Sequence, residues 1–197
     1  MQIDTNLLIT WGAVARKYKK NEYIFYEGDM CRYYHQIMEG SVRMCTYSDE
    51  GKVFIQGVFK KGQSFGEPPL FINERYPACA LAVTDAIILI LTKESLLKIL
   101  EEYPELQRRF LELFAKRIFI KANTAKHIIS QSPEHRIKAF LDRYKQEQNS
   151  PGGKVKIPYT RQEIANFTGL RVETVIRTTK KMSIQNILEI KNRKLYY

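Results

Sequence analysis

The stretch that decides the fold is TRQEIANFTGLRVETVIR, residues 160–177. Thr160 is a good N-cap and Glu163 follows three residues later, so a helix is predicted to begin here with a capping box. Gly169 then provides a turn, because glycine adopts positive φ without steric cost. A second helix, at about 170–181, is predicted to bury three apolar side chains, Val172, Val175 and Ile176. The stretch therefore predicts a helix-turn-helix, a motif that reads DNA in the major groove.

The outer face of the second helix carries side chains suited to base edges. Arginine donates two parallel hydrogen bonds to guanine O6 and N7, and glutamate accepts one from cytosine N4. Glu173 and Arg177 are four residues apart and share one helix face, so they can also brace each other. A solvated helix with one surface ion pair is the alternative, but the cap, the glycine turn and further basic residues argue against it. The predicted outward set is Arg171, Glu173, Thr174 and Arg177.

Charge is distributed unevenly along the chain. Its 197 residues include 32 Lys and Arg against 21 Asp and Glu, a formal net charge of +11. Residues 133–197 hold 14 basic and 6 acidic residues, whereas residues 1–132 hold 18 and 15. The excess coincides with the helix-turn-helix, which is typical of a module that binds a polyanion.

Several classes of protein are disfavoured. Cys31, Cys45 and Cys79 lack the close spacing of a zinc or iron–sulfur site, so we expect no metal. No signal peptide is apparent, and the longest apolar run, around 86–91, is too short to cross a bilayer. We therefore expect a cytoplasmic protein without a membrane partner. No nucleophile–base pair, phosphate loop or carboxylate pair stands out, so we expect no enzyme.

Turn signals and hydrophobic patterns predict the N-terminal elements. Residues 1–20 are predicted to form a short helical lead-in that ends in a basic run. From 21 to 91, turns with glycine recur about every ten residues between β-type runs, as in a compact antiparallel sandwich or barrel. The predicted strands include 33–38, 41–47, 52–59 and 83–91.

A long helical stretch follows. A first helix is predicted at 93–102, and a second begins at Pro104 and continues to about Ser130. Its residues at alternating spacings of three and four are typical of a coiled-coil seam, although a single helix packed on its own sheet remains the alternative. We expect a homodimer seam formed by Leu111, Phe114, Ile118, Lys121, Ala125 and Ile128.

The C-terminal part is predicted to form a winged helix-turn-helix. Ser132 and Pro133 mark the start of a helix. Segments 187–190 and 194–197 flank 191–193 as a terminal hairpin, the wing. The predicted fold is thus α+β, in three parts: a jelly-roll-like antiparallel β-roll sensor domain, a dimerisation helix and a winged helix-turn-helix DNA-binding domain, at 1–103, 104–131 and 132–197.

This organisation resembles the CRP/FNR superfamily of bacterial transcription regulators over essentially the whole chain. The sharpest shared motifs are 160–165, 172–177 and 65–67. The resemblance implies a dimer that recognises an inverted repeat in double-stranded DNA, with RNA polymerase as a partner. It implies base contacts by Glu173 and Arg177, and phosphate contacts by Thr160, Arg161 and Gln162. At position 172 the valine resembles members of the fumarate–nitrate branch of the family. At position 176 the isoleucine stands where the family usually has a small residue.

The effector site departs from the pattern of members that bind cyclic AMP. Gly66 and Glu67 match the pair that opens the phosphate cradle, but two prolines follow, and proline has no N–H to donate. Tyr76 stands where an arginine is expected and Arg75 is one residue off. Lys121 stands at a position where adenine is usually bound by threonine. These departures argue against cyclic AMP. The candidate effector pocket comprises Gly66, Glu67, Arg75, Tyr76 and Lys121.

The resemblance does not identify a cofactor or an effector for this chain. The family's N-terminal cysteine group is absent, which argues against an iron–sulfur cluster. Haem through His35, His127 or His135 is left open, as is the identity of the effector. The competing function is a cyclic-nucleotide-binding signalling module without a specific DNA role. In the resemblance, residues 129–134 would be a hinge between the long helix and the DNA-binding domain.

Overall fold

The computed structural model describes residues 2–130, 132–148 and 153–197, and for 126–130 the backbone alone. The chain forms two compact units, Met1–Phe119 and Ile120–Tyr197, and each is described by itself. The division crosses the long helix, so the boundaries at 103 and 131 remain predictions.

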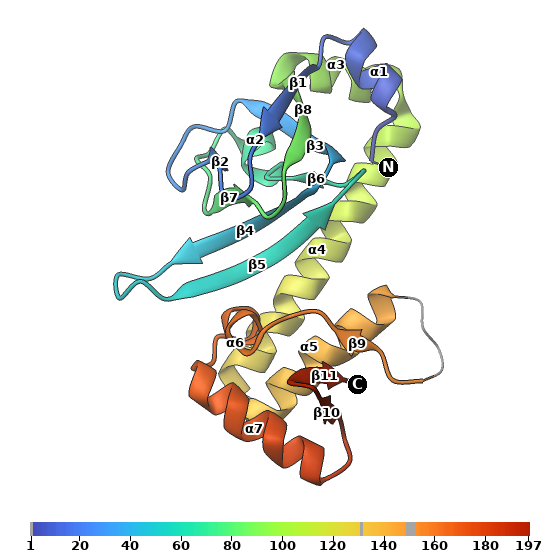
Figure 1. Ribbon diagram of the computed structural model, residues 1–197. Helices are drawn as coiled ribbons and strands as arrows, with labels where there is room; N and C mark the ends of the chain where they lie inside the picture. Colours follow the sequence, from blue (N-terminus) through green and yellow to red (C-terminus); the bar gives the residue numbers. More distant parts are fainter. Residues whose placement is uncertain (1, 131, 149–152) are drawn as a thin grey trace. The chain divides into compact units, whose positions relative to one another are not determined.

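Two four-stranded antiparallel sheets build the first unit (Figure 1). One has the strand order β1-β8-β3-β6 and the other β2-β7-β4-β5. The strands are β1 (Val14–Tyr18), β2 (Tyr23–Phe25), β3 (Tyr33–Glu39), β4 (Ser41–Tyr47), β5 (Val53–Lys60), β6 (Ser64–Phe65), β7 (Cys79–Ala82) and β8 (Ala86–Thr92). The antiparallel roll predicted for an α+β protein is confirmed.

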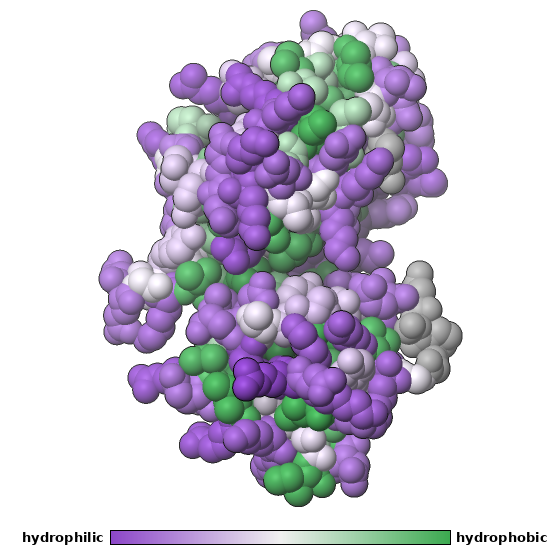
Figure 2. All heavy atoms as spheres, in the orientation of Figure 1, coloured by the Kyte–Doolittle hydropathy of each residue, from purple (hydrophilic) through white to green (hydrophobic). Residues whose placement is uncertain are grey.

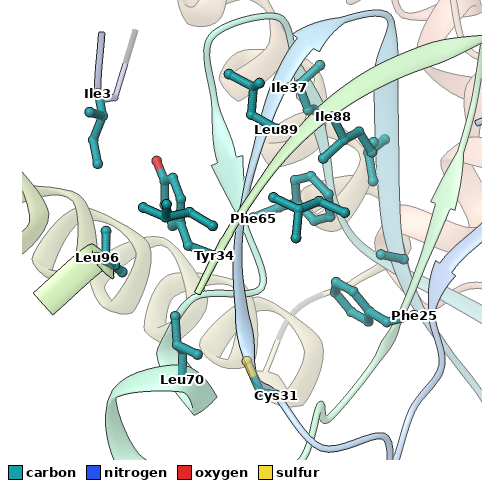
Figure 3. Close-up of a cluster of buried hydrophobic side chains, with 14 of the residues drawn as sticks. Ile3, Phe25, Cys31, Tyr34, Ile37, Phe65, Leu70, Ile88, Leu89 and Leu96 are labelled. Atoms are coloured by element: carbon teal, nitrogen blue, oxygen red, sulfur yellow. The ribbon is translucent and has the colours of Figure 1, made fainter. Parts of the chain in front are cut away.

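Four helices accompany the sheets: α1 (Thr5–Thr10), α2 (Pro68–Ile72), α3 (Lys93–Glu102) and α4 (Pro104–Ser130). The core gathers large side chains from sheet and helices, among them Tyr34, Phe65, Ile88 and Leu96 (Figure 3). The buried Gln36 amide bonds both the N–H and the carbonyl of Ile3, at 3.0 and 2.7 Å. This pairing satisfies a buried polar group and ties the N-terminus to β3.

The helical lead-in predicted for residues 1–20 is only partly correct. Residues 5–10 are helical, but residues 14–18 form β1, which pairs along its whole length with β8, from Val14↔Ile90 to Tyr18↔Ala86. The partner strand lies far along the chain, so the local basic pattern could not reveal the pairing. The predicted strand 83–91 begins later, at Ala86, and β7 precedes it as a separate strand.

The second unit contains the last part of α4, the helices α5 (Pro133–Glu147), α6 (Arg161–Thr168) and α7 (Val172–Ile184), and a three-stranded sheet of order β10-β11-β9. Strand β9 is Lys156–Ile157, and β10 (Glu189–Lys191) and β11 (Lys194–Tyr196) form the terminal hairpin. The predicted winged helix-turn-helix is confirmed. Within the described ranges, no helix is both long and apolar enough to cross a membrane.

His35 gives the first unit a predictable dependence on pH. Its ring is only 5% exposed and lies 5.5 Å from the ring centroids of Phe25 and Phe65. Burial, followed by the charge of Arg16, lowers the pKa of His35 to about 3, and the Tyr33 carbonyl opposes them. A histidine with an ordinary pKa of about 6.5 in the unfolded chain then stabilises the unfolded state as pH falls below that value.

We expect His35→Phe to flatten this dependence. In the wild type, protonation of unfolded His35 should lower the free energy of unfolding by about 2 kcal/mol between pH 7 and pH 5, and the variant should lose that part. Urea unfolding at the two pH values measures it, with His135→Phe as the matched control. An identical pH dependence in wild type and His35→Phe would show that His35 is not the responsible group.

Candidate DNA-binding surface

Reciprocal backbone capping holds the first helix of the helix-turn-helix. Thr160 Oγ1 accepts a hydrogen bond from the Glu163 N–H at 3.1 Å, and Glu163 Oε2 accepts one from the Thr160 N–H at 2.8 Å. This is the predicted capping box, and it satisfies two N–H groups that the helix itself leaves free. At the other end Gly169 adopts the left-handed conformation with φ 65°, and Arg136 Nη1 donates to the Thr168 carbonyl at 3.1 Å. Local sequence and one contact from α5 together fix the turn.

The buried face of α7 differs from the prediction. Val175, Thr179 and Met182 are buried, and the Thr179 hydroxyl donates to the Val175 carbonyl at 2.8 Å. Ile176, predicted to be buried, is 41% exposed. Each residue of a helix is rotated by about 100° from the previous one, so Ile176 leaves the face that Val175 occupies. Val172 and Thr174 are half-buried, so neither belongs fully to the face predicted for it.

Three charged side chains predicted for base or backbone contact are exposed. Glu173 and Arg177 lie on one face of α7, and Arg171 occupies its N-cap. In the described part of the chain, none of the three takes part in an ion pair, so Glu173 and Arg177 do not brace each other. Their hydrogen-bonding groups are therefore available to a ligand. Figure 2 shows hydrophilic side chains over most of the visible surface of this part of the molecule.

The three residues predicted to touch phosphates differ in charge, burial and hydrogen bonding. The Thr160 hydroxyl is already engaged with Glu163, which makes Thr160 a cap of the helix. Arg161 is half-buried, and burial lowers its pKa from the ordinary value of arginine without bringing it near neutrality. The exposed Gln162 amide donates to Asn166 Oδ1 at 3.0 Å. Of the three, Arg161 has the charge that a phosphate contact needs.

The tip of the wing presents a residue that the sequence analysis did not single out. Asn192 and Arg193 form the two-residue turn between Lys191 and Lys194, with φ of 47° and 63°. Such a turn favours Asn-Gly, because positive φ strains a residue that has a Cβ atom. Arg193 is exposed, and within the described ranges it forms no ion pair. Arg193 is thus an exposed cation held at positive φ, and its guanidinium is accessible from solvent.

The structure places the candidate effector residues as follows. Glu67 is fully buried, and one of its carboxylate oxygens binds the guanidinium of Arg117 on α4. Arg117 Nη2 also donates to the Ser64 carbonyl at 2.7 Å, and its guanidinium lies 5.3 Å from the Phe59 ring centroid. Arg117 was missed, because in the sequence it is one of many basic residues on a helix.

Three of the other four members of that set, Gly66, Arg75 and Tyr76, belong to the same unit. Arg75 Nη1 donates to the Gly28 carbonyl at 2.7 Å, and Tyr76 stacks on Phe25 with centroids 3.6 Å apart. Gly66 lies behind these rings, since a Cβ atom there would be 2.8 Å from Phe25 Cζ. Lys121 is exposed and belongs to the second unit.

The candidate dimer seam is partly an unpartnered apolar face of α4. Leu111 and Ile118 are 70% and 68% exposed, and Lys121 and Ala125 are also exposed. Phe114 is half-buried instead, because its ring packs edge-on against Phe71 and Phe110 of the same chain. The side chain of Ile128 lies outside the described residues, as does part of the predicted hinge at 129–134.

The residues considered for haem or redox chemistry are placed as follows. His35 is buried among aromatic rings, and His135 Nδ1 lies 2.9 Å from the Ser132 hydroxyl, while the side chain of His127 lies outside the described residues. Cys31, Cys45 and Cys79 are free thiols and all three are buried. In the described part of the chain, no three His, Cys, Asp or Glu side chains are grouped to hold a metal ion.

Comparison with known proteins assigns the two ends of the chain to two domain families. Residues 15–103 match the cyclic nucleotide-binding domain family, and residues 135–196 match the Crp-like helix-turn-helix domain family. A probable transcriptional activator of Rhizobium leguminosarum bv. viciae is 25% identical over 183 residues, which cover 91% of this chain and 75% of that protein. The fumarate and nitrate reduction regulatory protein of Yersinia pestis is 25% identical over 89% of this chain and 71% of its own length.

Solved structures share the fold. The c-di-GMP responsive global regulator CLP of Xanthomonas campestris superposes with a TM-score of 0.82 at 20% identity, over 98% of both chains. FixK2 of Bradyrhizobium japonicum superposes with a TM-score of 0.76 at 22% identity, over 93% of this chain and 91% of that one. Fold, surface and relatives together define a transcription regulator that binds DNA through a helix-turn-helix. The chain belongs to the CRP/FNR superfamily of bacterial transcription regulators.

The strained wing tip leads to a prediction with opposite effects on stability and on DNA binding. Arg193→Gly should raise the free energy of unfolding by about 1 kcal/mol, because glycine adopts positive φ without strain. It should also weaken binding to all DNA sequences alike and reduce the salt dependence by about one unit, if Arg193 contacts a phosphate. Urea unfolding and DNA titration at several salt concentrations measure the two effects. A stabilised variant with unchanged DNA affinity would show that the wing tip does not touch DNA.

Proposed function

We propose that the chain acts as a homodimer that recognises an inverted repeat in double-stranded DNA through α7 of each subunit. The observation that carries the proposal is that Glu173 and Arg177 are exposed on α7 and form no ion pair with each other. Helix α7 follows α6, which is fixed by its capping box and by the Gly169 turn. A two-fold dimer would place its recognition helices about 34–36 Å apart, in successive major grooves on one side of the DNA. Arg177 would donate to guanine and Glu173 would accept from cytosine.

Ile176 adds an apolar contact to this surface. Its exposed side chain lies on α7 next to Arg177, and aliphatic groups pack against the C5-methyl group of thymine in the major groove. We propose that Ile176 favours a thymine beside the guanine that Arg177 reads. The charge that positions the helix would come from Arg161, Arg171 and Arg193, because phosphate contacts set orientation without reading sequence.

The exposed stripe of α4 supports dimerisation. Leu111 and Ile118 are seven residues apart, and a large aromatic residue, Phe119, is exposed beside them. Apolar residues with this period on a long helix pack against an equivalent helix. We propose that α4 of two subunits pair along this stripe, with 1–103, 104–131 and 132–197 acting as sensor, dimerisation helix and DNA-binding domain.

Regulation would depend on a small effector other than cyclic AMP. One carboxylate oxygen of Glu67 is bound by Arg117, and Pro68 and Pro69 offer no N–H groups to a phosphate. An effector would shift an existing balance between orientations of the DNA-binding domains about residues 129–134. RNA polymerase in the cytoplasm would be the partner at promoters that carry the repeat, and run-off transcription with and without the protein measures that step.

Selection of bound DNA from a random pool tests the proposal. We expect the ligand-free protein to enrich an inverted repeat with fixed half-site spacing. Arg177→Ala should cost about 1–3 kcal/mol on that site and relax the preference for one guanine, and Ile176→Ser should relax it for one thymine. Arg161→Ala should weaken all sequences alike and lower the salt dependence by about one unit.

The opposite patterns would contradict these assignments. Unchanged base preference in Arg177→Ala would remove that residue from base recognition, and a base-selective loss in Arg161→Ala would remove it from phosphate binding. If no palindrome is enriched with or without a panel of anionic metabolites, the alternative of a signalling module without a specific DNA role is favoured.

Dimerisation is tested separately. Ile118→Asn should shift the protein from dimer to monomer, because the polar side chain would lie in the apolar stripe between the helices. Lys116→Asn is the matched control on the same helix and should remain dimeric. Sedimentation equilibrium measures both, and a monomeric wild type or a fully dimeric Ile118→Asn would contradict the assigned seam.

A further inference from the structure

A cavity of ≈ 480 Å³ opens in the β-roll between the edge strands of its two sheets. Strand β1 ends one sheet and β2 ends the other, so no hydrogen-bonded neighbour closes the roll on this side. We call this cavity the edge pocket; its charged and aromatic lining includes Arg16, Tyr18, Phe25, Arg32, Arg75 and Tyr76. Its volume lies within the range that small-molecule sites occupy, about 300–1,000 Å³.

The edge pocket carries excess positive charge. Its three arginines come from β1 and from the segments before β3 and before β7, and Asp29 is the one acidic residue in the lining. In the described part of the chain, none of the three arginines forms an ion pair with a carboxylate. Three arginines around one cavity repel one another, and an anionic ligand would relieve that repulsion while accepting hydrogen bonds from their guanidinium groups.

The register of β1 places Arg16 on the inner face of the roll. Arg16 is paired with Ile88, which is paired with Ile37, and both isoleucines are buried. Residues paired directly across a sheet share a face, and so do residues two apart, so Tyr18 lies on the same face. A solvated lysine, Lys17, occupies the opposite face. Arg16 is exposed, as Lys17 is, but it lies on the face of β1 that lines the edge pocket.

A buried polar atom without a partner borders the edge pocket. His35 lines the pocket, is 5% exposed, and its Nδ1 has no hydrogen-bond partner. A buried polar atom without a partner is destabilising, and a hydrogen bond with a ligand atom would offset that cost. The ring is neutral near pH 7, because burial and Arg16 hold its pKa near 3, so Nδ1 can accept or donate according to the tautomer.

An aromatic wall completes the site. Phe25 and Tyr76 stack with centroids 3.6 Å apart and planes 8° apart. Gly66 permits this packing, since a Cβ atom there would lie 3.2 Å from Tyr76 Cε1 as well as 2.8 Å from Phe25 Cζ. In Figure 3, Phe25 lies at the side of the core cluster away from Ile3 and Leu96. Both residues line the edge pocket, and their aromatic rings offer apolar contact to an aromatic ligand.

We propose that the edge pocket binds a small organic anion in which a carboxylate or phosphate is attached to a planar aromatic body. The anionic group lies among Arg16, Arg32 and Arg75, the aromatic body lies against the Phe25–Tyr76 wall, and a polar atom of the ligand contacts His35 Nδ1. The site differs from the phosphate cradle implied by Gly66 and Glu67, because neither of these residues is part of the lining of the edge pocket. Only the further step, that this anion is the effector, rests on the proposed function.

Titration of the purified full chain with defined probes tests the proposal. The probes are phenyl phosphate and benzoate, with inorganic phosphate as the anion without a body and benzyl alcohol as the body without a charge. Binding is followed by ligand-observed NMR, and by the ¹⁵N signals of the three histidines, with His35→Phe to assign His35. We expect one aromatic anion or both to bind below about 10 mM, at least tenfold more tightly than the phosphate and the alcohol, and to move the His35 Nδ1 signal.

Matched variants on one strand separate the pocket from general surface charge. Arg16→Gln should weaken the aromatic anion about tenfold, whereas Lys17→Gln removes the same charge from the opposite face of β1 and should leave binding unchanged within a factor of about two. Equal weakening by both variants, no binding of either aromatic anion, equally tight binding of inorganic phosphate, or an unmoved His35 signal would each overturn the proposal.

The outcome is independent of the DNA experiment. Binding of the aromatic anion by a protein that enriches no palindrome would support the edge pocket while contradicting the proposed function. An enriched palindrome in a protein that ignores all the probes would do the reverse. If both succeed, adding the probe to the DNA titration shows whether the anion changes DNA affinity, as an effector bound at this site must.

Discussion

One buried carboxylate determines how the first unit is organised. Glu67 is fully buried, and the charge that compensates it comes from Arg117, on a helix far along the chain. A buried ion pair that loses one partner costs about 3–5 kcal/mol, so this contact holds α4 against the roll. The same guanidinium binds the Ser64 carbonyl and covers the Phe59 ring, so the contact joins β5, β6 and α2 to α4. The apolar stripe of α4 is thereby left facing away from the roll, where a second subunit can reach it.

Because of this interaction, the motif at 65–67 makes contacts within the protein. In the family pattern Gly66 and Glu67 open a cradle for a cyclic phosphate, but here the glutamate serves the interior of the protein and the glycine makes room for stacked rings. The charged cavity of the roll lies elsewhere, between the edge strands β1 and β2. A family fold can therefore keep the residues of a motif while these residues make different contacts.

The errors in the predictions share a physical cause. Residues 14–18 were expected to belong to a helical lead-in, and Ile176 was expected to be buried, yet the first became a strand and the second is exposed. In each case the local pattern is compatible with more than one structure or more than one buried face, and contacts with residues distant in the sequence determine which one forms. Arg117 and Arg193 were overlooked because only burial beside a carboxylate and positive φ distinguish them from other basic residues.

The sequence by itself determined the α+β class, the β-roll followed by helices, the helix-turn-helix and the exposure of Glu173 and Arg177 on its second helix. These follow from short-range rules: a capping box within four residues, a glycine turn, the periods of strands and helices, and segregated charge. Tertiary structure alone decided the pairing of β1 with β8, the ion pair between Glu67 and Arg117, and the gathering of Arg16, Arg32 and Arg75 around one cavity. Each of these joins residues far apart in the chain, and no local propensity specifies which distant partner a strand edge or a buried charge will meet.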